Sequence, residues 1–271
     1  LALGNLARTL KQSFINAYLD AETFEPSLEE GKGGKSSDRE SRTRTPFEMA
    51  KSYYYAQQKK SGRRDQREGV DYFATPEPVG FKMVEFANLK PGEHVLEPSA
   101  GHGAIARFFD EATNRTIVEP SLELSTKAEL ASPGARVIND RFENLHITNK
   151  YDAIVMNPPF GVGGKTAMEH IAKAAGHLRN GGRIVALLPE GGMADKRFTD
   201  FMESEAANGL YLTAMFNLPT VTFERAGSSV RTHIVVLDKQ VDIEDARRLP
   251  DVMRRDYTES ESINALFDRI E

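Results

Sequence analysis

From residue 92 onward, short apolar runs alternate with helical patterns, and this alternation restricts the possible fold more than any other feature. Runs rich in β-branched residues and bounded by Gly, Pro, Asn or Asp predict strands. There are seven: HVLEP (94–98), RTIVEP (115–120), ARVIND (135–140), YDAIVM (151–156), RIVALLP (183–189), YLTAMFNLP (211–219) and RTHIVVLD (231–238). Helical patterns occur at about residues 103–111, 121–131, 165–179 and 196–207. The alternation predicts an α/β fold with a doubly wound, mostly parallel seven-stranded sheet covered on both faces.

The residues before this alternation are more polar and predict a separate extension. Apolar residues recur at helical spacing over residues 2–20, and the Gly- and Ser-rich residues 31–44 predict a linker. Thr45 and Glu48 then form a capping box, which predicts a second helix. We expect three parts: a helical, basic N-terminal extension with a flexible linker (1–68), the α/β domain (69–241) and a charged C-terminal helix or tail (242–271).

Charge is unevenly distributed along the chain. Residues 32–68 hold 11 Lys/Arg against 5 Asp/Glu, whereas the whole chain holds 35 against 40. Within this segment, YYYAQQKKSGRR (53–64) places aromatic residues among basic ones, a combination that can grip a nucleic-acid backbone and stack on bases. The alternative is a solvated linker whose tyrosines belong partly to a core. We favour nucleic-acid contact.

Several classes of protein are excluded or disfavoured by composition. The absence of Cys excludes disulfides, a thiol nucleophile and thiolate metal sites. No apolar run approaches 18 residues, and Arg8 and Lys11 interrupt the apolar N-terminal stretch, so neither a membrane span nor a signal peptide is predicted. We therefore expect a cytoplasmic protein. The chain begins with Leu1, which is consistent with a piece of a longer polypeptide.

In a doubly wound sheet, ligands bind at the carboxyl ends of the strands, so the residues found there are candidates for a site. After the first strand, Gly101 and Gly103 allow a tight turn and close approach of a ligand, and Glu97 offers a hydrogen-bond acceptor. Glu119 follows the second strand at the offset where an acid holds a ribose diol, although it could instead cap a helix. After the third strand, Asp140 and Phe142 could hold the edge and face of a base.

The fourth strand runs directly into Asn157, two prolines and Phe160. Asn157 precedes proline and is therefore biased to an extended backbone, while the prolines fix φ and cannot donate hydrogen bonds. The tip thus presents the side-chain oxygen of Asn157 and the carbonyl of Pro158 as acceptors beside an aromatic face. This arrangement suits a planar ring that carries an exocyclic amine, with Phe160 stacked on the ring.

In this order, the segments resemble the S-adenosylmethionine-dependent amino-methyltransferases of the adenine-N6 type. The resemblance runs from residue 72 to about 238: YFATPEPVG (72–80), EPSAGHGAIA (97–106), Glu119, Asp140 with Phe142, NPPF (157–160) and LPTVTFERAGSSVRTHIVVLD (218–238). It implies the Rossmann-like class I methyltransferase fold for residues 69–241 and S-adenosyl-L-methionine as cofactor, with no metal.

The resemblance also implies a role for individual residues. The residues that would bind the cofactor are Phe73, Thr75, Pro76, Glu97, Pro98, Ser99, Ala100, Gly101, Gly103, Glu119, Asp140, Arg141, Phe142 and Asn157. The catalytic residues would be Asn157, Pro158, Pro159 and Phe160. Phe160, Lys165 and Phe223 would bind the substrate.

The implied reaction is site-specific methylation of the N6 amine of adenine in DNA. The same motif occurs in methyltransferases of RNA bases and of protein glutamine, and a non-catalytic nucleic-acid-binding module is a further alternative. Only about 30 residues follow the last predicted strand, too few for the recognition domain that restriction-type members carry there. Specificity would therefore come from further domains of a longer polypeptide or from a separate specificity partner, or be relaxed.

Overall fold

The computed structural model describes residues 44–60, 73–240 and 252–271. The chain divides into two compact units, residues 1–63 and 64–271. In the first unit, the structure describes helix α2 (Pro46–Lys60). The capping box is confirmed, because Glu48 N–H donates to Thr45 Oγ1 (3.1 Å) and Thr45 N–H donates to Glu48 Oε2 (2.7 Å). The predicted helix over 2–20, almost all of the linker and most of the basic segment lie outside the described residues.

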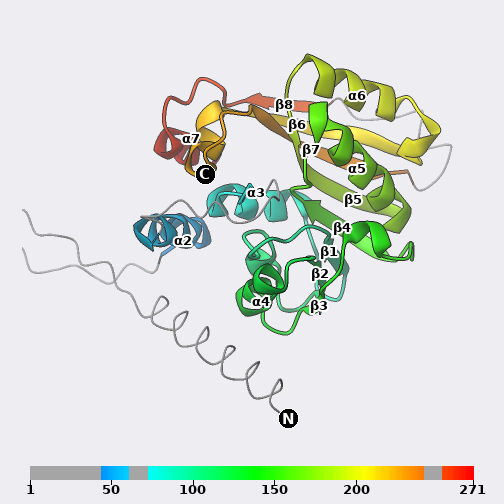
Figure 1. Cartoon of the computed structure of the whole chain (residues 1–271), viewed down its shortest axis with the longest axis horizontal. Helices are drawn as coiled ribbons and strands as arrows, with labels where there is room; N and C mark the ends of the chain where they lie inside the picture. The colour runs from blue at the N-terminus through cyan, green and yellow to red at the C-terminus, as the bar shows by residue number, and fades with distance from the viewer. Residues whose placement is uncertain (1–43, 61–72, 241–251) are drawn as a thin grey trace, which may run out of the picture. The chain divides into compact units, whose positions relative to one another are not determined.

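The second unit is built on one sheet with the strand order β3-β2-β1-β4-β5-β7-β6-β8 (Figure 1). Strand β7 is antiparallel to β5 and β6, and the other neighbouring strands are parallel. The strands are β1 (His94–Glu97), β2 (Asn114–Val118), β3 (Arg136–Ile138), β4 (Tyr151–Met156), β5 (Leu178–Pro189), β6 (Leu210–Leu218), β7 (Thr232–Lys239) and β8 (Met253–Asp256). The prediction of a doubly wound, mostly parallel sheet is confirmed, and all seven apolar runs form strands.

Helices cover both faces of this sheet (Figure 1). On one face, α5 (Lys165–His177) and α6 (Gly192–Met202) share a core with inward residues of the central strands. On the other, α3 (Glu77–Ala87) packs on β4, β5 and β7, and α4 (Leu122–Ala131) packs beside β3. Short 3₁₀ turns connect these elements: η1 (Ala106–Phe108), η2 (Phe142–Asn144), η3 (Val162–Gly164), η4 (Glu205–Ala207) and η5 (Thr220–Ala226).

Two predicted elements differ from the structure. The helix expected at residues 103–111 is reduced to η1, because Gly103 has a left-handed backbone (φ 84°) and Phe109 is already extended. The sheet has eight strands among the described residues rather than seven. The extra strand, β8, comes from the segment that the sequence predicts to be a helix or tail. All four side chains of this edge strand are exposed, so its sequence MRRD lacks the apolar run by which the other strands are predicted.

After β8, helix α7 (Ile263–Ile270) returns over the sheet and packs against α3 and η5. Leu266 and Phe267 are fully buried, so the end of the chain is anchored in the unit. Because η5 carries Phe223, this helix supports one wall of the region described below. Among the described residues, no helix combines the length and the apolar character that a membrane span requires.

Candidate active site

The carboxyl ends of β1, β2, β3 and β4 lie side by side at one edge of the sheet, because these strands are adjacent and parallel. Almost all of the residues expected to bind the cofactor or to catalyse the reaction follow these four ends. They are residues 97–103 after β1, Glu119 after β2, 140–142 after β3 and 157–160 after β4. Segments far apart in the sequence are therefore brought to one edge, as expected for a site of this fold.

Glu119 joins the ends of β1 and β2. Its Oε2 accepts a hydrogen bond from the N–H of Gly101 (2.8 Å), and its Oε1 accepts one from the N–H of Ser121 (2.9 Å). Burial raises the pKa of Glu119, and the two backbone donors oppose that rise. Each carboxylate oxygen keeps a further lone pair. The group is therefore held in place by the backbone while it can still accept hydrogen bonds from the hydroxyls of a ribose.

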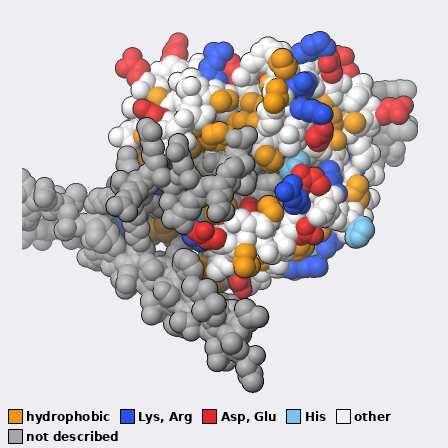
Figure 2. Space-filling model, in the orientation of Figure 1, with side chains coloured by type: hydrophobic (Ala, Val, Ile, Leu, Met, Phe, Trp, Pro, Cys, Tyr) orange, Lys and Arg blue, Asp and Glu red, His pale blue; other side chains and the backbone are white. Residues whose placement is uncertain are grey.

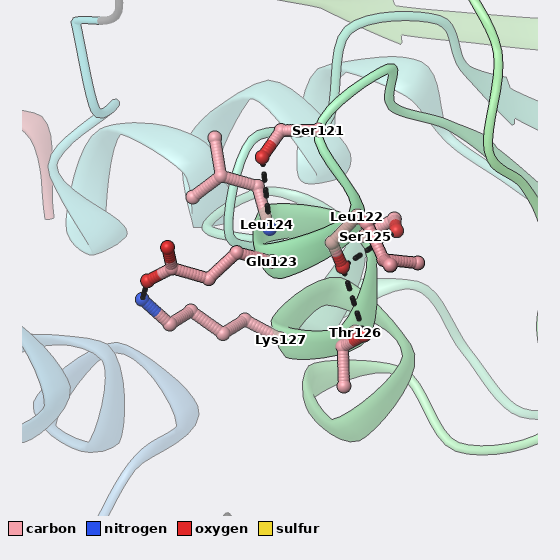
Figure 3. Close-up of polar contacts among 7 residues, drawn as sticks. All are labelled: Ser121, Leu122, Glu123, Leu124, Ser125, Thr126 and Lys127. Carbon is pink, nitrogen blue, oxygen red and sulfur yellow. Dashed lines mark hydrogen bonds and ion pairs between the residues drawn. The ribbon is translucent and has the colours of Figure 1, made fainter. Parts of the chain in front are cut away.

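Helix α4 begins just after Glu119 and is capped by its own residues. Ser121 Oγ accepts from the N–H of Leu124 (3.4 Å), and the hydroxyls of Ser125 and Thr126 donate to the carbonyl of Leu122 (Figure 3). Farther out, Lys127 pairs with Glu123 on the exposed surface (2.8 Å). Ser121 is therefore the N-cap of α4, and the alternative that Glu119 caps this helix does not hold.

Glu97 is a buried carboxyl group at the end of β1, only 1% exposed. Burial raises its pKa well above the ordinary value; the N–H of Ala106 opposes this and the nearby Glu119 adds to it. Its Oε2 has no hydrogen-bond partner among the described residues. A buried polar atom without a partner costs free energy, so a ligand that carries hydroxyl or ammonium donors fits this position. The hydrogen-bonding groups of S-adenosylmethionine are of this kind.

The two glycines of the loop after β1 have different roles. Both have left-handed backbones, with φ of 55° at Gly101 and 84° at Gly103. A Cβ at Gly103 would lie 2.9 Å from the Cα of Ala128 and 2.9 Å from the Cβ of Ala131. Gly103 is therefore needed for close packing on α4, and its expected role in the approach of a ligand stays a prediction. Gly101 donates its N–H to Glu119 and lies at the carboxyl ends of β1 and β2, where the cofactor is expected to bind.

A polar contact that the sequence did not reveal joins α3 to the same loop. Glu77, at the start of α3, is buried and lies 3.8 Å from the imidazole of His102. Burial opposes ionisation of Glu77, but hydrogen bonding to His102 and the charge of Arg107 outweigh it, so its pKa lies below the ordinary value. The contact fixes the YFATPEPVG segment against the Gly-rich loop. No local sequence pattern announces it, because the partners are 25 positions apart.

The residues after β3 behave differently from one another. Asp140 is exposed, and hydrogen bonds from the Asn144 side chain (2.8 Å) and the Arg141 N–H (2.7 Å) lower its pKa. Phe142 is 2% exposed and packs against the rings of His170 and His177. The expectation that Phe142 offers its face to a base therefore does not match the structure, since the ring belongs to the core. The charged side chains of Asp140 and Arg141 are exposed just beyond the carboxyl end of β3.

Asn157 is oriented by the segment that precedes α3. Its Nδ2 donates to the carbonyl of Phe73 (2.9 Å) and to Oγ1 of Thr75 (3.0 Å). Because a backbone carbonyl can only accept, the nitrogen of the amide must face Phe73. Both amide protons are thereby engaged, and Oδ1 is left as the atom that can accept a hydrogen bond. Pro158 is buried behind it.

Three phenylalanines from distant segments meet beside Asn157. The ring of Phe73 is stacked on that of Phe160 (centroids 6.2 Å apart, 22° between planes) and meets Phe223 edge-on (6.5 Å, 74°). The sequence placed Phe160 and Phe223 on the substrate side but assigned Phe73 to the cofactor. Phe223 is as buried as Phe142 (2% exposed), so it supports Phe73 from the core, whereas Phe160 is 9% exposed. The structure adds Phe73 to the aromatic cluster formed by Phe73, Phe160 and Phe223, because the 73–76 segment crosses the end of β4.

Lys165, the first residue of α5, lies near this cluster in sequence but points into solvent. Its side chain is largely exposed, and its Nζ lies 3.8 Å from Oε1 of Glu169, one helical turn away. Exposed pairs of this kind are weak and leave the ammonium available to other anions. Its assignment to the substrate stays a prediction.

Comparison with known proteins agrees with this fold. Residues 84–190 match the family model of the methyltransferase small domain. A class I S-adenosylmethionine-dependent methyltransferase from Listeria monocytogenes has a similar structure (TM-score 0.59, 15% identity, covering 83% of this chain and 78% of that one).

Two further structures are named as subunits of type I restriction-modification enzymes. One is the methyltransferase subunit from Streptococcus thermophilus (TM-score 0.59, 18% identity) and the other a modification subunit from Vibrio vulnificus (TM-score 0.53, 17% identity). Each alignment covers 82% of this chain and 56% of the subunit, so the chain spans little more than half of their length. Residues 84–190 thus match the methyltransferase small-domain model, and the chain has the fold of the class I S-adenosylmethionine-dependent methyltransferases.

Proposed function

We propose that the chain is an S-adenosylmethionine-dependent methyltransferase that acts on the N6 amine of adenine in DNA. The observation that carries the proposal is the orientation of Asn157, whose amide protons are held by Phe73 and Thr75. The remaining Oδ1 and the Pro158 carbonyl would together supply two acceptors, which matches the two protons of an aromatic amine. Such a pair selects against hydroxyl, thiol and carbon acceptors, which do not carry two N–H donors.

The proposed catalysis depends on positioning and electrostatics. Hydrogen bonds from the amine to Asn157 and Pro158 draw the nitrogen lone pair out of conjugation with the ring and hold it in one direction. They strengthen as positive charge develops on the nitrogen, so they favour the transition state over the bound substrate. Neither a covalent intermediate nor a strong base is required of the protein. S-adenosylmethionine, when bound, supplies a methyl group attached to a positively charged sulfur.

The aromatic cluster supports a planar substrate. Stacking of a base on an aromatic ring contributes about 1–3 kcal/mol, which offsets much of the cost of taking a base out of a duplex. Phe160 follows the acceptors directly and Phe73 is stacked on it, while the buried ring of Phe223 supports Phe73 edge-on. A glutamine side chain carries the same amine chemistry but has no ring for these phenylalanines, so the cluster favours a nucleobase.

The choice of DNA over RNA rests on the named relatives. Two proteins of this fold are named as restriction-modification subunits, which suggests a DNA substrate and a separate specificity partner. The basic residues 32–68 would add contacts to phosphates. We place the methyltransferase domain at residues 69–241 and propose a cytoplasmic location.

Methyl transfer to pooled substrates tests the proposal. The full chain is incubated with methyl-labelled S-adenosylmethionine and, in parallel, with unmethylated genomic DNA, total RNA and cell protein. We expect label in DNA, recovered as N6-methyladenine after digestion and mass spectrometry. Label confined to RNA, to protein glutamine or to cytosine would replace adenine in DNA as the substrate. Cofactor binding by calorimetry without transfer to any pool would instead indicate a non-catalytic module.

A further inference from the structure

An exposed apolar tip stands beside the proposed target site. Val162, two residues after Phe160, is 85% exposed and is the most exposed large hydrophobic residue that the structure describes. Met193, at the start of α6, is 59% exposed. A Cβ on Gly163 would lie 2.3 Å from Sδ of Met193, so the methionine side chain covers the backbone next to Val162. We call Val162 and Met193 the apolar tip.

The backbone under this tip is fixed rather than loose. Arg197 of α6 donates from Nη1 to the carbonyls of Val162 (2.7 Å) and Gly163 (2.5 Å). Gly161, Gly163 and Gly164 all have left-handed backbones, with φ of 65°, 56° and 77°. At Gly161 a side chain would also collide with Thr166, because a Cβ would lie 2.2 Å from its Oγ1. A backbone conformation that requires glycine and a guanidinium anchor therefore accompany one apolar side chain that is exposed to solvent.

The surroundings of the tip carry cations that can meet phosphates. Lys165, Lys196 and Arg231 are largely exposed there, each within 4.0 Å of a single acidic partner. Exposed ion pairs are weak and are readily exchanged for phosphate oxygens. In the view of Figure 2, basic and acidic side chains are interspersed rather than gathered into one large field of a single sign. Because each of these three cations has an acidic partner, positive charge does not distinguish this loop; the exposed apolar side chain does.

We propose that the apolar tip enters duplex nucleic acid and fills the gap left when the target base is taken into the site. This inference rests on the proposed function, since a gap arises only if a base leaves a stack. Apolar side chains that insert between base steps are a known means of holding a distorted duplex. The tip follows the residue proposed to stack on the base, so the same short segment would receive the base and replace it.

The test compares native with heat-denatured substrate. Sheared unmethylated genomic DNA is methylated with labelled S-adenosylmethionine in both forms by the full chain and by Val162→Ser. Because a single strand has no stack to repair, we expect Val162→Ser to lower the rate on native DNA about tenfold and to change the rate on denatured DNA by less than about twofold. Val162→Leu, which keeps the apolar bulk, should retain the rate on native DNA.

The matched control is Ile147→Ser. Ile147 is also a β-branched residue and is 60% exposed, but it precedes β4 and so lies at the opposite edge of the sheet. It should leave both rates unchanged.

Equal loss on both forms, or no loss on either, would overturn the role of the tip and leave the proposed function standing. A parent enzyme that methylates only denatured DNA would also overturn it. Absence of transfer to DNA in the parent would instead refute the proposed function, and the tip with it.

Discussion

The two halves of the site are formed by different kinds of side chain. On the side of β1 and β2, carboxyl groups are buried and held by the backbone: Glu119 by Gly101 and Ser121, and Glu97 by Ala106. On the side of β4, the groups are an amide oxygen and three phenylalanines, followed by an exposed apolar tip. The first half is a set of fixed polar contacts around one small ligand. The second is suited to a flat group that arrives from outside with a larger molecule.

This difference predicts that variants on the two sides fail in different ways. Changes on the β1 and β2 side should act on cofactor affinity, whereas changes on the β4 side should act on transfer with affinity preserved. A variant that affected both equally would show that the two halves are coupled more closely than their separate contacts indicate.

Asn157→Ala should have the largest effect. The proposed acceptor at Oδ1 is lost, and lost electrostatic contacts to a transition state typically cost on the order of a hundredfold or more in rate. Cofactor affinity by calorimetry should change little. Asn157→Asp is the informative companion, because it keeps an acceptor but cannot donate to the Phe73 carbonyl, and it should fall between the parent and Asn157→Ala. Transfer by Asn157→Ala at the parental rate would remove the proposed mechanism.

Lowering the pH should reduce the free energy of unfolding through His177, which packs against Phe142 and Tyr151 in the core. Burial, with the nearby charges of Lys173 and Lys150, lowers the pKa of His177 to about 4, from an ordinary 6.5. The unfolded chain therefore binds the proton at higher pH than the folded chain does. The contribution of the neutral imidazole is complete above about pH 6.5 and is lost as the pH falls toward 4, by up to about 3 kcal/mol.

Denaturant unfolding at several pH values checks this prediction. His177→Leu removes the titrating group from between Phe142 and Tyr151, so its free energy of unfolding should fall less steeply between pH 6.5 and 4. His146→Gln, at an exposed position, should follow the parent. Parallel curves for the parent and His177→Leu would show that the pKa of His177 is not lowered in the folded chain.

Glu119→Gln should weaken cofactor binding without stopping transfer at saturation. The amide retains one oxygen, but its NH₂ group would face either the Gly101 or the Ser121 N–H, so one hydrogen bond to a charged acceptor is lost and two donors oppose each other. Hydrogen bonds to charged groups contribute about 1.5–3 kcal/mol, which corresponds to roughly 10- to 150-fold in affinity. Glu123→Gln, one turn into α4 and exposed, is the control. An unchanged affinity would place the ribose elsewhere.

The sequence predicts the sheet well because local signals specify it. Each of the seven apolar runs is a strand, and the capping box at Thr45 is present with both of its hydrogen bonds. It misses β8, since Met253–Asp256 is placed by pairing with β6 at the edge and not by burial. Contacts set by the fold, such as Glu77 with His102, have no local pattern to reveal them.

At the site, residue types predict chemistry better than they predict direction. The identity of Asn157 indicates an acceptor, but only the contacts to Phe73 and Thr75 show that the nitrogen of the amide is engaged and the oxygen is left to accept. Phe142 follows a strand as a base-binding residue would, yet the space between η2 and α5 takes its ring into the core. The direction in which a loop side chain points depends on the space that neighbouring elements leave for it. The sequence of one segment does not specify that space.

Substitutions in the aromatic cluster should have smaller effects than the loss of Asn157, and they can show which ring bears the base. Phe160→Ala removes a stacking face worth about 1–3 kcal/mol, so KM for DNA should rise by up to roughly 5- to 150-fold while cofactor affinity is retained. Phe73→Leu keeps apolar volume beside Phe160 and leaves the backbone carbonyl that orients Asn157 in place, so it should raise KM by less than Phe160→Ala does. If Phe73→Leu proved the more damaging of the two, Phe73 would be the ring on which the base stacks, and the face of Phe160 would serve to position it.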